Sequence, residues 1–287
     1  MPEMREKDGK EGDFVRMGVR LREVRDSGAG LQAEDKVSII VPCVELLEPT
    51  RTCIQHIFAH TPLLYKGGEL IVVCDKPSRK LLKYLTSIYL SGMVKLDISP
   101  EPRGCATAYN IGLLLAEGDY IAIVSNDCFV LEGWLEPLLK ALKKHPEWGW
   151  VSSTIIDGDG NVKTRFAACT CCLFTREAVE NVGLFDERFS GGVGFEDDDL
   201  YRRFLLQGYE PHGVSESRVL HPEPQTTMKL LYGKGYSRIQ KFSRNHLLFM
   251  KKWLLWLHEN EEKLRNDPCW KVGLDKNGTK WSEVPWI

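Results

Sequence analysis

Residues 106–127 read ATAYNIGLLLAEGDYIAIVSND, a stretch in which two secondary structures follow one another directly. The first part, 106–118, has the composition of a helix and ends on a glycine. The second part, 119–125, is an apolar run typical of a strand buried on both faces of a sheet. The polar pair Asn126 and Asp127 comes directly after it. The stretch therefore predicts a helix–strand unit with polar groups at the carboxyl end of the strand.

Two similar apolar runs precede this unit, VSIIVPCV at 37–44 and ELIVVCD at 69–75. A helical segment follows each of them, and a shorter strand is predicted at 93–99. Alternation of strands and helices favours a parallel, right-handed, doubly wound sheet. We therefore expect an α/β fold in which helices cover both faces of a mostly parallel central sheet.

The second half of the chain alternates less regularly. The sequence predicts a helix at 129–145, two strands joined by a turn within 148–164, and a strand at 166–175. The segment FEDDDLYRRFLLQGY at 195–209 begins with acids and continues as an amphipathic helix. The basic, aromatic end of the chain, from about residue 228, is expected to form helices that pack on the domain.

Composition sets limits on the class of protein. The chain has 287 residues, a size that suits one large α/β domain with extensions. Its net charge of −2 gives no electrostatic case for a nucleic-acid partner. No apolar run reaches the roughly 18–20 residues that span a bilayer, and the charged start lacks the apolar stretch of a secretory signal. We expect a soluble, cytoplasmic protein, with peripheral attachment to a membrane left open.

The nine cysteines mostly lie in apolar segments, and their number is odd. This usage is typical of reduced, buried thiols. Cys169, Cys171 and Cys172 have neither a second CxxC pair nor a histidine at zinc spacing, so we interpret them as structural.

Acidic and amide side chains follow three of the expected strands: Glu45, Asp75, and the pair Asn126 and Asp127. Ligands of doubly wound sheets bind beyond the carboxyl ends of the strands, so these groups should converge on one crevice. A carboxylate there suits hydrogen bonds to a base or ribose, and another suits a divalent cation on a diphosphate. The alternative is that such a residue only caps the next helix.

Four adjacent carboxylates occupy positions 196–199. One or two acids stabilise a helix N-terminus, but four exceed that need. Clustered carboxylates raise one another's pKa, which favours a general base. His221 follows a short apolar run, where it is either a metal ligand or an ordinary histidine.

Two other patterns are expected to be structural. Asp157-Gly158-Asp159 lies in DGDGN between two β-rich runs, which is a hairpin-turn pattern rather than a metal motif. The glycines at 191–194 do not join a strand to a helix, as a phosphate-binding loop requires, and are interpreted as a mobile loop on the acceptor side.

Several blocks together resemble a known family. AxGDYIxxxxxD, ending at Asp127, is followed by GxFDExF at 183–189 and EDxDLxxRxxxxGY at 196–209, and then by VLHP. Their order is similar to that in family 2 glycosyltransferases of the GT-A fold, over about residues 37–225. The blocks look most like the branch of rhamnosyltransferases and galactofuranosyltransferases that make surface polysaccharides.

The resemblance implies roles for individual positions. Asp197 matches the catalytic base, and Glu196 would orient it or the acceptor. Asp127 and His221 match metal ligands. The positions that match nucleotide-binding residues are Pro42, Val44, Glu45, Asp75, Arg103, Asn126 and Asp127. The family's Asp-x-Asp metal motif reads Ser125-Asn126-Asp127 here, so metal binding would depend on Asp127, His221 and the diphosphate.

The resemblance also divides the chain. Residues 1–35 form a polar extension, 36–227 the GT-A domain, and 228–287 a helical extension. Within the domain, 36–127 would bind the nucleotide and 128–227 would hold the acceptor and the catalytic groups.

The implied function is transfer of a sugar, with inversion, from a UDP-, dTDP- or GDP-linked donor to a hydroxyl of a carbohydrate or glycoconjugate. Mn²⁺ or Mg²⁺ would neutralise the diphosphate. The alternatives are a retaining transferase, a nucleotidyltransferase, or a nucleotide- or carbohydrate-binding protein without catalysis. A homo-oligomer formed through the C-terminal helices also remains open.

Overall fold

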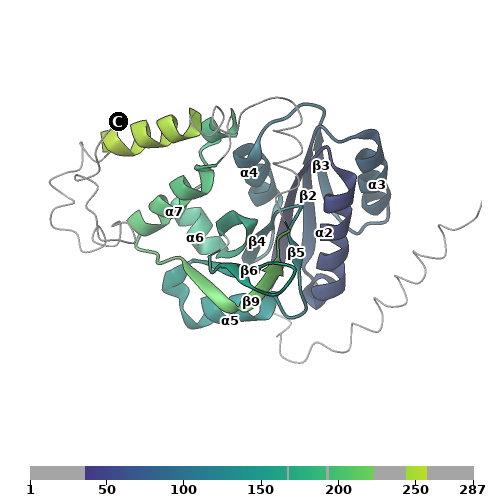
Figure 1. The fold of residues 1–287 in the computed structure, drawn as a ribbon, viewed down its shortest axis with the longest axis horizontal. Helices are drawn as coiled ribbons and strands as arrows, with labels where there is room; N and C mark the ends of the chain where they lie inside the picture. The colour runs from purple at the N-terminus through teal and green to yellow at the C-terminus, as the bar shows by residue number, and fades with distance from the viewer. Residues whose placement is uncertain (1–35, 167, 192–193, 223–243, 257–287) are drawn as a thin grey trace, which may run out of the picture.

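A mixed β-sheet lies between helices in the computed structural model, which describes residues 36–166, 168–191, 194–222 and 244–256 (Figure 1). The strand order is β3-β2-β1-β4-β8-β6-β9-β5, and β7 pairs with β6. The expected extension 1–35 lies outside the described residues, as does most of 228–287.

The strands are β1 (Val37–Val44), β2 (Glu69–Asp75), β3 (Lys95–Ser99), β4 (Tyr120–Val124), β5 (Phe129–Val130), β6 (Trp150–Ile156), β7 (Val162–Thr164), β8 (Cys171–Thr175) and β9 (His212–Leu220). The α-helices are α2 (Leu47–His60), α3 (Arg79–Leu90), α4 (Cys105–Leu115), α5 (Leu135–Lys144), α6 (Arg176–Val182) and α7 (Glu196–Leu206). Short 3₁₀ turns are η2 (Pro62–Lys66), η3 (Pro146–Trp148), η4 (Ala168–Thr170) and η5 (Glu187–Gly191). Residues 244–256 form a further helix.

The first half of the chain forms the parallel part of the sheet. Strands β3, β2, β1 and β4 pair in parallel, and Val44 at the end of β1 lies beside Asp75 at the end of β2. The sheet is antiparallel beyond β4, since β8 pairs antiparallel with β4, and β6 pairs antiparallel with β8. The expected α/β class and the strands at 37–44 and 69–75 are confirmed.

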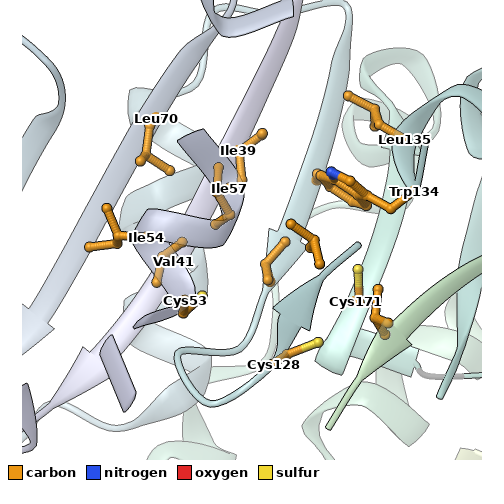
Figure 2. Close-up of a cluster of buried hydrophobic side chains, with 14 of the residues drawn as sticks. Ile39, Val41, Cys53, Ile54, Ile57, Leu70, Cys128, Trp134, Leu135 and Cys171 are labelled. Carbon is orange, nitrogen blue, oxygen red and sulfur yellow. The ribbon is translucent and has the colours of Figure 1, made fainter. Parts of the chain in front are cut away.

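The central strands β1, β2 and β4 are buried on both faces of the sheet, which explains why they are continuous apolar runs. Alternate residues of β1 contribute to two separate cores. Ile39 and Val41 pack in one core with residues of α2, α3 and α5, and Figure 2 shows Ile54 and Ile57 of α2 beside them. Ile40 packs on the other face, with residues of α4, α6 and α7.

Two predicted elements in the second half are shorter than expected. The helix predicted at 129–145 begins only at Leu135, because Phe129 and Val130 pair with the end of β9 instead. The strand predicted at 166–175 is limited to Cys171–Thr175, because its partner β4 ends opposite Cys171. In both cases pairing between distant segments outweighs the local pattern.

The sequence DGDGN forms the predicted turn between β6 and β7. One carboxylate oxygen of Asp157 accepts hydrogen bonds from the backbone N–H groups of Asp159 and Asn161, at 3.0 and 2.9 Å. Asp157 therefore stabilises a hairpin, as expected.

The described cysteines are all free thiols, and all but Cys105 are buried. This agrees with the expectation of buried thiols, except at Cys105. Cys269 lies outside the described residues. Over the four described ranges, no helix combines the length and the apolar character needed to cross a lipid bilayer.

Candidate active site

The carboxylates predicted from separate parts of the sequence surround the start of α4. Cys105 is the first residue of that helix, and its side chain is exposed. Nearby protein desolvates its thiol, and the negative charges of Glu196, Asp197, Asp75 and Asp127 add to this effect and raise the pKa of Cys105 to about 12. The four carboxylates come from the ends of β2 and β4 and from the first turn of α7, and each lies near enough to the start of α4 to act electrostatically on the same thiol.

Asp75, at the end of β2, organises the loop that leads into α4. Its carboxylate is 5% exposed and accepts hydrogen bonds from the backbone N–H groups of Arg103 and Gly104, at 2.6 and 3.0 Å. Arg103 Nε donates to the same carboxylate at 2.8 Å, and Nη2 lies 2.6 Å from Asp97 Oδ1 in an ion pair. Asp75 and Arg103 are thus brought together, and the guanidinium is fixed between two acids.

Gly104 brings the second half of the chain onto α4. It has φ +92°, and a Cβ atom on it would lie 2.2 Å from the carbonyl oxygen of Ser190, so a larger residue would clash. Ser190 Oγ also lies 2.9 Å from Thr107 Oγ1 and accepts a hydrogen bond from Thr107 N at 3.0 Å. Neither Gly104 nor Ser190 is among the site residues predicted from the sequence. The only local signal was a glycine directly before a predicted helix.

Asn126 and Asp127 follow β4, as expected, but they make different contacts. Asn126 is 5% exposed, and its Nδ2 donates to Thr50 Oγ1 at 2.9 Å. Thr50 Oγ1 in turn donates to the carbonyl of Leu46 at 2.8 Å, so Asn126 ties the end of β4 to the start of α2. Asp127 is 6% exposed, and its Oδ1 lies 3.3 Å from Nε2 of His221.

Asp127 and His221 are suited to hold a divalent cation together. Two neighbouring ligands of an octahedral ion, each about 2.1 Å from the metal, lie roughly 3 Å apart, and the Asp127–His221 contact is 3.3 Å. Ser125 adds no carboxylate at this place, and its carbonyl accepts from Cys53 Sγ. The described residues contain no group of three or more His, Cys, Asp or Glu side chains arranged for a metal. Further ligands would have to come from phosphate or water.

Glu196 and Asp197 begin α7 after a residue in an unusual backbone conformation. Phe195 has φ 72°, a left-handed value that costs a bulky residue energy and is found at functional sites. Burial and the neighbouring charge of Asp197 raise the pKa of Glu196 to about 8, and burial raises the pKa of Asp197. The two carboxyls therefore hold protons more tightly than ordinary acids, which suits proton transfer near neutral pH.

Asp199 belongs to the same acidic run but makes structural contacts. It is 0% exposed and lies 2.6 Å from Lys252 Nζ and 3.0 Å from Arg203 Nε. Trp253 Nε1 donates to it at 3.0 Å. Lys252 also pairs with Asp186, at 2.9 Å. Asp199 thus joins α7 to the helix of residues 244–256.

The predicted nucleotide-binding positions of the first strand lie at its carboxyl end. Pro42 and Val44 are half-buried there, and Glu45 begins the following turn with φ 50°. Lys76, after β2, has φ 45° and lies 3.2 Å from the Glu45 carboxylate. A pocket of about 600 Å³ opens between these two turns, and its lining includes Glu45, Leu46, Pro49, Lys76, Ser78 and Lys80.

The raised pKa of Glu196 predicts a distinct pH dependence of stability. Between its ordinary pKa of 4.5 and about 8, the folded protein binds more protons at this site than the unfolded chain. Stability contributed by the neutral acid is therefore present at low pH and lost as pH rises through this window. Glu196→Gln should melt at the wild-type temperature near pH 4.5 and above it at pH 8, by roughly 2–4 °C for each kcal/mol gained.

Thermal unfolding of both proteins across this pH range checks the prediction. Glu180, exposed on α6, offers the control, because Glu180→Gln should follow wild type at every pH. A Glu196→Gln curve parallel to wild type would show that Glu196 ionises normally in the folded protein.

Comparison with known proteins agrees with this α/β fold. The family described as Glycosyl transferase family 2 matches residues 38–167. The O-antigen biosynthesis protein RfbC of Myxococcus xanthus is 25% identical over 226 residues, which cover 66% of this chain and 17% of that protein. An uncharacterized glycosyltransferase of Haemophilus influenzae is 33% identical over 99 residues, 34% of this chain and 40% of that protein. The chain spans less than half the length of these relatives.

Among solved structures, the mannosyltransferase PcManGT from Pyrobaculum calidifontis, in complex with GDP-Man and Mn²⁺, has a similar fold. The TM-score is 0.56 at 17% identity, and the match covers 84% of this chain and 72% of that one. The fold is thus that of the GT-A glycosyltransferases. Residues 38–167, somewhat less than half of the chain, are similar to glycosyl transferase family 2.

Proposed function

We propose that this protein transfers a glycosyl group, with inversion, from a nucleoside-diphosphate sugar to a hydroxyl of a carbohydrate or glycoconjugate. The observation that carries the proposal is the convergence of Asp75, Asp127, Glu196 and Asp197 on the start of α4. The same side of the sheet therefore offers groups for a nucleotide, for a diphosphate and for proton transfer. A protein that only binds nucleotides has no need of the half-buried carboxylate pair at Glu196 and Asp197.

In this proposal Asp197 is the general base. Its burial raises its pKa, which makes its ionised form a stronger proton acceptor than an ordinary aspartate. The carboxylate takes the proton of the acceptor hydroxyl while that oxygen attacks the anomeric carbon. The bond from the anomeric carbon to the diphosphate oxygen breaks, and the nucleoside diphosphate leaves with the bonding electron pair. Glu196, beside Asp197, orients the base or the acceptor.

Asp127 and His221 are the residues that would hold Mn²⁺ or Mg²⁺. When bound, the ion would neutralise charge on the diphosphate. Arg103, fixed by Asp75 and Asp97, adds a positive charge near the nucleotide. Pro42, Val44 and Glu45 supply the neighbouring wall at the end of β1.

The donor and acceptor classes are proposed from similarity. The name of RfbC refers to O-antigen biosynthesis, which supports a surface polysaccharide as the product. The sequence blocks favour a rhamnosyl- or galactofuranosyltransferase, with a dTDP- or UDP-linked donor. The alternative is a GDP-linked donor, because the PcManGT structure contains GDP-Man. The thermal-shift experiment below compares these nucleotides.

Thermal shift with nucleoside diphosphates tests donor and metal binding together. Ligand at about 100 times its Kd stabilises a folded protein by about 2.7 kcal/mol, so UDP, dTDP or GDP with Mn²⁺ should raise Tm by several degrees. His221→Ala should lose the Mn²⁺-dependent part of the rise and keep the part due to the nucleotide alone.

His145→Ala provides the control, since His145 pairs with Glu147 at 3.0 Å in a different part of the fold. The proposed function is wrong if no nucleoside diphosphate shifts Tm with either metal. The metal assignment is wrong if His221→Ala responds to Mn²⁺ as wild type does.

A further inference from the structure

The helix of residues 244–256 contacts the chain just before the carboxylate pair. Figure 1 shows this helix beside α7. Asn245 on it is 0% exposed, and its Nδ2 donates to the carbonyls of Phe189 and Gly194, at 2.8 Å each. Gly194 is two residues before Glu196, so one side chain holds the backbone that leads into the predicted catalytic turn.

These two hydrogen bonds use the full donor capacity of an amide. Both partners are carbonyl oxygens, which only accept, so each needs one N–H of Nδ2. Aspartate and leucine have a similar size but cannot donate to either carbonyl. An aromatic contact strengthens the same junction, because the ring of His246 stacks on Phe195 with centroids 5.3 Å apart.

The same stretch is fixed on its other side by the donor half of the domain. Ser190 contacts Thr107 of α4, and its carbonyl lies against Gly104. Gly104 in turn donates its N–H to Asp75. The backbone before Glu196 is thus held between the loop bound to Asp75 and the C-terminal helix.

We propose that Asn245 is a positioning residue for the Glu196–Asp197 pair, so that the helix of residues 244–256 belongs to the catalytic apparatus. The inference rests on the proposed function. Asn245 does not contact the reacting groups. It fixes the backbone at Phe189 and Gly194, and this placement sets where the carboxylates meet the acceptor. A displacement of about 1 Å at such a site lowers the rate by roughly 10²-fold.

Steady-state kinetics of Asn245→Ala tests the proposal. We expect kcat per folded molecule to fall about 10²-fold, whereas the donor KM stays within about twofold because the strand ends are untouched. Hydrogen exchange should quicken in η5 and in the first turn of α7. Should Asn245→Ala not fold, Asn245→Ser allows the same comparison, since its hydroxyl can still donate to one of the carbonyls.

Two control variants separate positioning from general stability. Leu247→Ala changes an exposed side chain on the same helix, and Ile57→Val weakens the core at α2, away from the site. Both should keep kcat and the exchange pattern of η5. If Asn245→Ala retains the kcat of these controls, Asn245 is merely structural and the proposal is overturned.

The outcome also distinguishes this inference from the proposed function. If wild type turns over no donor, the proposed function fails, and hydrogen exchange alone decides whether Asn245 holds the segment. Unchanged exchange in η5 and α7 would then overturn the positioning, and faster exchange would support it.

Discussion

Asp197→Asn is expected to lower kcat by about 10²–10⁴-fold, the usual contribution of a general base. The amide has nearly the same shape as the carboxylate but cannot accept the proton of the acceptor hydroxyl. Because Asp75 and Asp127 remain, the thermal shift produced by nucleoside diphosphate and Mn²⁺ should stay close to wild type. Initial rates over a range of acceptor concentrations, measured beside the thermal shift, separate lost chemistry from lost binding.

Asp198→Asn is the matched control for this variant. Asp198 is the next residue of the same acidic run, but its side chain is exposed. Its replacement should change kcat less than tenfold. If Asp197→Asn keeps kcat within a few-fold of wild type, Asp197 is not the base, and Glu196 becomes the residue to test.

Asp199→Asn is expected to destabilise the protein rather than to affect the chemistry directly. Breaking a buried ion pair costs about 3–5 kcal/mol, because the partner charge remains buried without compensation. Lys252 keeps its contact with Asp186, so we expect the lower end, about 3 kcal/mol. This corresponds to a fall in Tm of roughly 6–12 °C.

Denaturant unfolding of Asp199→Asn and Asp198→Asn measures the contrast directly. Asp198→Asn should not lower the stability at pH 7, because desolvation and the neighbouring charge of Asp197 raise the pKa of Asp198 to about 6 and so disfavour its ionised form. Equal loss of stability in the two variants would mean that the contacts of Asp199 with Lys252, Arg203 and Trp253 add nothing to the folded state.

The acidic run 196–199 shows why the site was only partly predictable. The sequence indicates that four adjacent carboxylates exceed the needs of a helix N-terminus, and a family resemblance selects Asp197. The local sequence gives no reason to separate Asp199 from the other three acids. Its ion-pair partner, Lys252, lies more than 50 residues further along the chain. The direction in which each carboxylate points depends on how the C-terminal helix packs against α7.

Local sequence determined the parallel half of the sheet. Strands buried on both faces need uninterrupted apolar runs, and the runs at 37–44 and 69–75 match β1 and β2 residue for residue. Strand ends also fixed the place of Asp75 and Asp127, because the carboxyl ends of parallel strands share one edge of the sheet.

The tertiary structure alone decided the remaining features. β5 replaces the start of a predicted helix because its residues pair with β9, about 90 residues later in the chain. Asp127 contacts His221, which is also about 90 residues later in the sequence. Asn245, near the end of the chain, donates hydrogen bonds to the carbonyls of Phe189 and Gly194. Periodicity and propensity describe only neighbouring residues, whereas these contacts form when distant segments pack together. The sequence by itself thus determined the parallel half of the sheet and its acidic edge, and the packing of the second half decided which groups complete the site.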